Sequence, residues 1–351
     1  MSTLENALDA VLADPLTRVA APERAIGYVG GDVPLDLLLA ATRPAMHLPW
    51  NVDRPTPFAD RWLEGRFPLW ARSMLEDWSA GRFDALAQVV FTRGNDVAHR
   101  LYYYVCELQR RGDLAGPEPL VFDVARVPRA ASLRHTEAAI HSLAAQLSVG
   151  AAQIVAGIRQ ANHLRATFER LMNARSSDGP LYEKLVRASL FTDVQPLLAA
   201  HTMPVARQPR ARILLAGSVP PDERLHLAVE ETGASIVAEL HERCALRLGS
   251  AVPEEGEPMA ALARQVCSGT LGPRAFGDAG ARLVAAARHA RADAVVQWLS
   301  DDDEGLAWLV PAQRRALDAA NLPTLTLTSR RGDCSDGAGP EIARFVTGIG
   351  S

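Results

Sequence analysis

The sequence predicts an α/β protein built from two lobes, each a small parallel sheet, joined by a helical block and preceded by an N-terminal helix. Three observations lead to this prediction. Short apolar runs alternate with helical patterns from residue 25 to about 131, the strand-like runs disappear between 132 and about 200, and the alternation resumes near 211. Such alternation is typical of parallel sheets with helices on both faces.

The first lobe contains LAQVVFT, a continuous apolar run bounded by polar residues, as expected of a buried parallel strand. Pro34 suits the start of one helix, and Asp96 can cap another. Strands are predicted at 25–29, 45–48, 86–92 and 120–123, and helices at 35–42, 58–80 and 97–110.

The next part of the chain has only helical patterns, at 133–146, 150–175 and 181–190. The second lobe then follows, with strands predicted at 213–216, 235–239, 294–298 and 324–328 and helices at 222–232, 259–267, 280–289, 306–320 and 340–347. The predicted division is an N-terminal helix and tether (1–24), a first lobe (25–131), a helical block (132–204) and a second lobe (205–351).

Composition excludes several classes of function. The net charge is −4 and Lys184 is the only lysine, so no basic face for nucleic acid is indicated. No segment approaches the ~20 apolar residues of a membrane span. The N-terminus has acidic residues in place of the basic start of a signal peptide, and we therefore expect a cytoplasmic protein with no membrane partner.

Four loops directly follow predicted strands, at 30–34, 93–96, 217–222 and 239–244. In open α/β sheets such loops surround the ligand site, and helix N-termini there suit a carboxylate, thioester carbonyl or phosphate. The alternative is that they are ordinary turns and caps. The candidate cleft residues are Pro34, Arg72, Ser73, Asn95, Asp96, Gly217, Ser218, Glu239 and His241.

Neither GxGxxG, GxxxxGK[ST] nor GxSxG is present, so no NAD or ATP site and no hydrolase nucleophile is indicated. His241 and Cys244, beside two glutamates, allow either a mixed metal site or a polar loop with one buried thiol. The acidic run at 301–304 is interpreted as a helix cap, with a cation site as the alternative. Cys106 and Cys267 are expected in the core and Cys334 at the surface.

Three phrases connect these features to a family: IGYVGGDVPLDLLLAA (26–41), the segment from FPLWARSM to LYYY (67–104), and ILLAGSVPPDERLHLAVEETGASIVAELHERC (213–244). Together they resemble the iron–sulfur subunits of 2-hydroxyacyl-CoA dehydratases and benzoyl-CoA reductases. The resemblance implies two flavodoxin-like (Rossmann-like) lobes, a related partner subunit or homodimer, an ATP-dependent activator and a [4Fe-4S] cluster that reduces a thioester carbonyl.

The resemblance also implies three cysteine thiolates for the cluster. At the first family position this chain has Pro68 or Leu69, at the second Asn95, and at the third Cys244. One thiolate out of three makes a conventional cluster doubtful. Three hypotheses remain: a subunit that shapes an acyl-CoA pocket beside a metal-holding partner, a member that binds a thioester or acid without radical chemistry, or a site for a different metal. If active, the protein would be a lyase or a reductase; the alternative is a non-catalytic binding or scaffold subunit.

Overall fold

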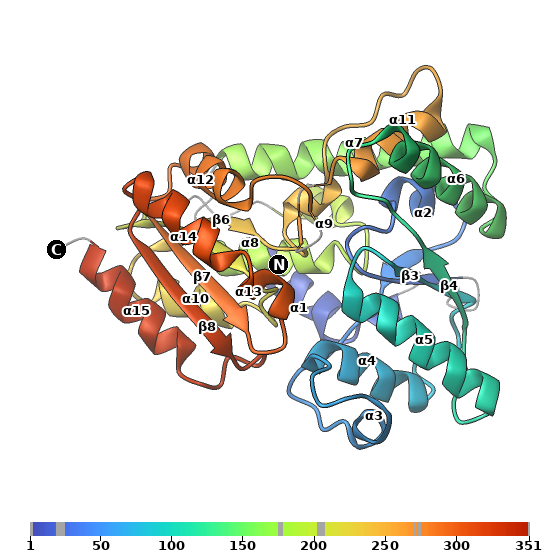
Figure 1. The fold of residues 1–351 in the computed structure, drawn as a ribbon, viewed down its shortest axis with the longest axis horizontal. Coiled ribbons are helices and arrows are strands. Elements are labelled where there is room, and N and C mark those ends of the chain that lie inside the picture. Colours follow the sequence, from blue (N-terminus) through green and yellow to red (C-terminus); the bar gives the residue numbers. More distant parts are fainter. Residues whose placement is uncertain are drawn as a thin grey trace.

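The computed structural model describes residues 3–18, 25–174, 178–201, 208–269, 271–272 and 275–349. These residues form two four-stranded parallel sheets with strand orders β2-β1-β3-β4 and β6-β5-β7-β8 (Figure 1). The two-lobed α/β fold predicted from the sequence is therefore confirmed. The predicted tether at 19–24 lies outside the described residues.

The first sheet is covered on both faces, which explains its uninterrupted apolar strands. Its strands are β1 (Ile26–Val29), β2 (Ala45–His47), β3 (Gln88–Thr92) and β4 (Glu118–Phe122). One face packs against α2 (Leu35–Ala40), α6 (Ala130–Gln146) and α7 (Ala151–Ala174). The other face packs against α4 (Leu69–Ser79) and α5 (Asp96–Arg111), with α3 (Pro57–Trp62) beside α4.

The second sheet has the same construction. Its strands are β5 (Arg212–Gly217), β6 (Ser235–Leu240), β7 (Ala294–Ser300) and β8 (Thr324–Arg330). One face packs against α10 (Arg224–Glu230) and α15 (Ala338–Ile349), and the other against α12 (Ala279–Ala290) and α14 (Val310–Ala319).

Only helices lie between β4 and β5 in the described part of the chain: α6, α7, α8 (Gly179–Ala188) and α9 (Gln195–Ala200). The N-terminal helix α1 (Leu4–Ala13) buries Leu4 and Leu8 against Leu181 and Leu185 of α8. Among the described residues, no single helix is long and apolar enough to cross a membrane. Helices α6 and α7, which are separated by a bend, reach the required length and hydropathy only when they are taken together.

Helix α11 (Pro258–Cys267) follows β6 in the sequence but packs on the first lobe. Its Leu262 and Val266 join the core that includes Ile140 and Leu143 of α6. Figure 1 shows it beside α6 and away from the second sheet. Between β6 and α12 the chain therefore crosses back to the first lobe. Helix α11 belongs to the second lobe by sequence but to the first lobe by its packing.

Several local boundaries differ from the sequence prediction, and three of the differences bear on the cavity. The segment 58–80 forms two helices because Pro68, which has no N–H to donate, caps a separate α4. The cap of α5 is Asn95, whose side chain accepts from the Ala98 N–H, and Asp96 is the first helical residue. The segment 306–320 is divided between α13 (Glu304–Ala307) and α14.

The contact between α2 and α7 depends on Gly157. A Cβ atom there would lie 2.6 Å from the Ala40 nitrogen and would overlap the Asp36 carbonyl. Gly157→Ala is therefore expected to destabilise the protein by about 1–3 kcal/mol, although alanine normally favours a helix. Chemical denaturation measures the change.

Gly348→Ala in α15 is the matched control, because a Cβ atom there meets no other atom within 4 Å. We expect it to be neutral or slightly stabilising. Equal effects of the two substitutions would contradict the proposed close packing at Gly157.

Candidate functional site

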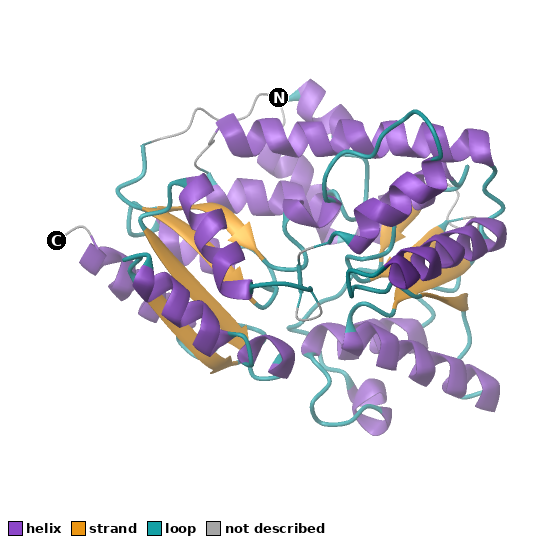
Figure 2. Cartoon of the chain, turned by 45° about the horizontal axis from the view of Figure 1, so that its top comes forward, coloured by secondary structure: helices purple, strands orange, loops and turns teal. Residues whose placement is uncertain are grey.

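The carboxyl ends of both sheets face a cavity of about 580 Å³. Figure 2 shows the loops of the two sheets facing each other across the middle of the molecule. The loops after β1, β3, β5, β6 and β7 contribute residues 29–36, 95–97, 217–221, 242–243, 246–250, 300 and 302–306 to its lining. A cavity of this size at strand ends is a typical small-molecule site of α/β proteins.

The two lobes touch at the cavity. A Cβ atom on Gly31 would lie 2.9 Å from the Glu242 carbonyl oxygen, so a side chain cannot fit there. Asn95 Nδ2 donates to Glu242 Oε2 at 2.7 Å. Arg126 of the first lobe pairs with Asp32 and also donates to the carbonyl oxygen of α11 residue Val266. These contacts fix the strand-end loops relative to one another.

Five of the residues selected from the sequence line this cavity: Pro34, Asn95, Asp96, Gly217 and Ser218. Ser218 Oγ lies 2.9 Å from Asp303 Oδ2 and accepts from the Ser300 N–H at 3.0 Å. The loop after β5 is thereby fastened to the loop after β7. The side chain of Asp303 also caps α13, as predicted for the acidic run.

Arg72 and Ser73 lie on α4 but do not line the cavity. Arg72 donates to the carbonyl oxygens of Glu64 at 2.6 Å and Phe67 at 3.0 Å, so it holds the turn before α4. Ser73 is buried, and its hydroxyl accepts from the Asn51 N–H at 2.7 Å. Both side chains fasten the loops that support the cavity wall.

Glu239 and His241 form a buried cluster with His226, outside the cavity lining. Glu239 Oε1 lies 3.0 Å from His226 Nε2 and 2.9 Å from His241 Nε2. Burial opposes ionisation of Glu239, but the two imidazoles outweigh it and lower the pKa of this carboxyl. Burial likewise opposes protonation of His226, yet the charge and hydrogen bond of Glu239 raise its pKa.

Two carboxyls of one cavity wall have pKa values raised toward neutrality. Burial, reinforced by the nearby charge of Asp32, raises the pKa of Glu242 to about 7. Burial raises the pKa of Asp302 to about 6, although Ser300 donates a hydrogen bond to it. Groups that titrate in this range can donate or accept a proton during a reaction.

A family model now identifies the chain's relatives. The model of the 2-hydroxyglutaryl-CoA dehydratase D-component matches residues 32–345. The chain belongs to this family. No individual curated protein matches the chain. The match covers every strand except β1 and most of the residues that line the cavity, and it confirms the family expected from the three sequence phrases.

The residues of this chain do not fit the family's iron–sulfur cluster. Pro68, Leu69 and Asn95, which stand where the resemblance implies two of the cluster's cysteines, line the cavity and supply no thiolate. Cys244 is buried outside the lining, and burial raises the pKa of its thiol to about 11. In the part of the chain that the structure describes, no three His, Cys, Asp or Glu side chains are grouped as metal ligands.

Among the lining residues that sequence reasoning missed are Glu242, Arg243, Arg247 and Asp302. The first two lie in a loop that was selected from the sequence, and Asp302 lies in the acidic run that was interpreted as a cap. Their position after a predicted strand could have indicated these residues. The sequence does not show which way each side chain points.

Proposed function

We propose that this chain is a cytoplasmic, divergent subunit of a 2-hydroxyacyl-CoA dehydratase or benzoyl-CoA reductase-like system. It binds an acyl thioester or a related acid in the cavity between its lobes, holds no cubane cluster of its own and acts beside a related subunit. The proposal is supported mainly by one observation: within the residues that the family model matches, Leu69 and Asn95 line the cavity where the resemblance implies cysteine ligands.

Binding in the cavity does not require the cluster. The carboxyls of Glu242 and Asp302 and the hydroxyl of Ser218 provide hydrogen-bonding groups at its wall. Trp50, Trp70 and other apolar side chains provide the surface for a hydrocarbon chain or ring. A mostly apolar pocket with a few polar groups is typical of small-molecule sites.

Ligand binding tests the proposal directly. Isothermal titration of the full chain with an acyl-CoA thioester and with the corresponding free acid is expected to show saturable binding of at least one of them. The same titration on Trp70→Glu, which places a charge on the apolar wall, is expected to lose that binding. Absence of binding by the wild-type chain, alone and with its partner, would favour the non-catalytic scaffold alternative.

The chain purified alone without oxygen is expected to contain well below one iron atom per molecule, because a single thiolate leaves too few soft ligands for a cubane. Iron and sulfide analysis measures this. Cys244→Ser is expected to leave the iron content unchanged, since Cys244 does not line the cavity. Stoichiometric iron and sulfide that disappear in Cys244→Ser would refute the proposed loss of the cluster.

A further inference from the structure

One end of the cavity carries a positive charge without a counter-ion. Arg247 lines the cavity and is only partly exposed. Its guanidinium donates to neutral oxygens: Ser189 Oγ at 2.7 Å and the carbonyl oxygens of Arg243 at 3.3 Å and Cys244 at 3.4 Å. No aspartate or glutamate of the described residues lies within ion-pair distance of it.

Arg243 adds a second incompletely paired guanidinium to the same end. The side chain is 7% exposed and lines the cavity. Its Nη2 contacts the Pro220 carbonyl oxygen and Glu183 Oε1, but its Nη1 has no hydrogen-bond partner among the described residues. Its Cζ lies 4.8 Å from the centre of the Trp50 ring. A buried donor without a partner is costly, so a ligand oxygen that reached Nη1 would relieve this cost.

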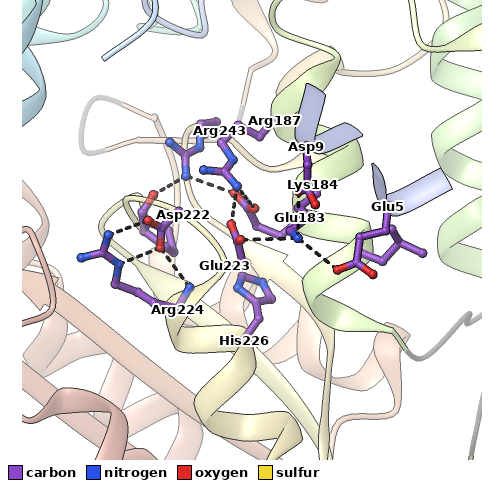
Figure 3. Close-up of polar contacts among 12 residues, drawn as sticks. Glu5, Asp9, Glu183, Lys184, Arg187, Asp222, Glu223, Arg224, His226 and Arg243 are labelled. Atoms are coloured by element: carbon purple, nitrogen blue, oxygen red, sulfur yellow. Dashed lines mark hydrogen bonds and ion pairs between the residues drawn. The ribbon is translucent and has the colours of Figure 1, made fainter. Parts of the chain in front are cut away.

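The carboxylate behind Arg243 is shared. Glu183 lies 3.2 Å from Arg187 as well as 3.3 Å from Arg243, and Arg187 also pairs with Glu223. Figure 3 shows both guanidiniums directed at Glu183, while Lys184 turns toward Glu5 and Asp9 of α1. The network therefore holds Arg243 from behind, and the charge that remains without a counter-ion at this end is that of Arg247.

His47 stands beside the two arginines as a neutral ring. Its Nδ1 lies 2.8 Å from the Leu48 carbonyl oxygen, and its Nε2 accepts from the Gly30 N–H at 3.3 Å. For both contacts to form, one ring nitrogen must donate and the other must accept. Only a neutral imidazole has one nitrogen of each kind. Burial first, and then the charges of Arg243 and Arg247, lower the pKa of His47 to about 4.

The walls around this charge are aromatic and apolar. The His47 ring packs edge-on against Tyr28 at 5.1 Å and Trp50 at 5.3 Å between ring centres, and Leu190 and Leu246 line the same cavity. The planar fork of a guanidinium matches a carboxylate through two parallel hydrogen bonds.

We propose that Arg243 and Arg247 form a carboxylate-binding subsite, and that the cavity takes a free monocarboxylic acid with an aromatic or branched apolar body. The inference rests on the proposed function, since it assigns the ligand class of the same cavity. A ligand with one negative charge matches the single charge that Arg247 leaves without a counter-ion.

The test is titration calorimetry on the full chain with 3-phenylpropanoate, its neutral amide, its CoA thioester, free CoA and inorganic phosphate. We expect the acid to bind and the amide to bind about 10- to 100-fold more weakly, as expected for hydrogen bonds to a charged group. Arg247→Met is expected to weaken acid binding by a similar factor. Arg247→Lys, which keeps the charge but loses the fork, should give an intermediate loss.

Folding controls separate binding from damage. Arg247→Met removes a charge without a counter-ion, so its melting temperature is expected to equal or exceed that of the wild type. Arg264→Met, at an exposed site on α11 outside the cavity lining, should leave acid binding within about threefold. Arg243→Met provides a second, independent removal of the subsite.

The outcomes distinguish this inference from the proposed function. Binding of the thioester that is unaffected by Arg247→Met, with no binding of the acid, overturns the carboxylate subsite and leaves the proposed function standing. Binding of free CoA or phosphate that depends on Arg247, with no binding of the acid, identifies a phosphate subsite and also overturns the inference. If no probe binds, both proposals fail.

Discussion

Arg165→Met is expected to lower the free energy of unfolding by about 3–5 kcal/mol, the largest loss among the substitutions considered. Arg165 and Asp36 form a bidentate ion pair at 2.8 and 2.6 Å, with side-chain exposures of 6% and 1%. The substitution leaves the Asp36 carboxylate buried without its counter-ion. It also removes the bond of 2.8 Å from Arg165 Nε to the Leu248 carbonyl oxygen, which links α7 to the loop after β6. Urea denaturation at pH 7 measures the effect.

Two further variants test the explanation. The double variant Asp36→Leu/Arg165→Met removes both charges and is expected to recover a large part of the lost stability. Arg159→Met, on the same helix, removes an exposed ion pair with Glu254 and should change stability by less than about 1 kcal/mol. If Arg159→Met were as harmful as Arg165→Met, burial of the ion pair would not be the cause.

The order of strands and helices could be predicted from the sequence because each sheet is buried on both faces. Continuous apolar runs such as the β3 strand Gln88–Thr92 have no other simple explanation in a chain of this composition. Helix boundaries were less certain, since the break between α3 and α4 depends on Pro68 and on side-chain packing within one helical pattern. The return of α11 to the first lobe is a long-range contact that periodicity does not encode.

The candidate site was predictable in position but only partly in composition. The rule that ligands bind at the carboxyl ends of parallel strands located the loops that line the cavity. It does not say which way each side chain points. Asn95 points into the cavity, where it meets Glu242, whereas Arg72 turns back to its own helix start and Glu239 faces two histidines. Arg247 lacks a counter-ion because no carboxylate of the described residues lies within ion-pair distance of it. The sequence does not show this, since it depends on the three-dimensional arrangement.

Glu239→Gln is expected to destabilise the protein by about 2–4 kcal/mol near pH 6, because it removes the charge that His226 and His241 share inside the second lobe. The amide keeps the size of the side chain and one acceptor oxygen, so the loss reports the charge. Glu169→Gln, at an exposed site on α7, is the matched control and should change stability by less than about 0.5 kcal/mol. Equal stability of Glu239→Gln and the wild type would contradict the assignment of a buried ionic cluster.

The difference in stability between the wild type and Glu239→Gln should depend on pH in two windows. The lowered pKa of Glu239 gives the wild type stability that is present above pH 4.5 and is lost as the pH falls through the folded-state value. The raised pKa of His226 gives stability that is fully present below pH 6.5 and is lost as the pH rises through its folded-state value, by up to about 1.4 kcal/mol per pH unit for one proton. The difference should therefore be largest between pH 4.5 and 6.5 and shrink on both sides, whereas Glu169→Gln should give a flat difference. Denaturation curves from pH 4 to 9 measure both profiles, and a difference for Glu239→Gln that grows above pH 6.5 would show that the His226 proton is not held by Glu239.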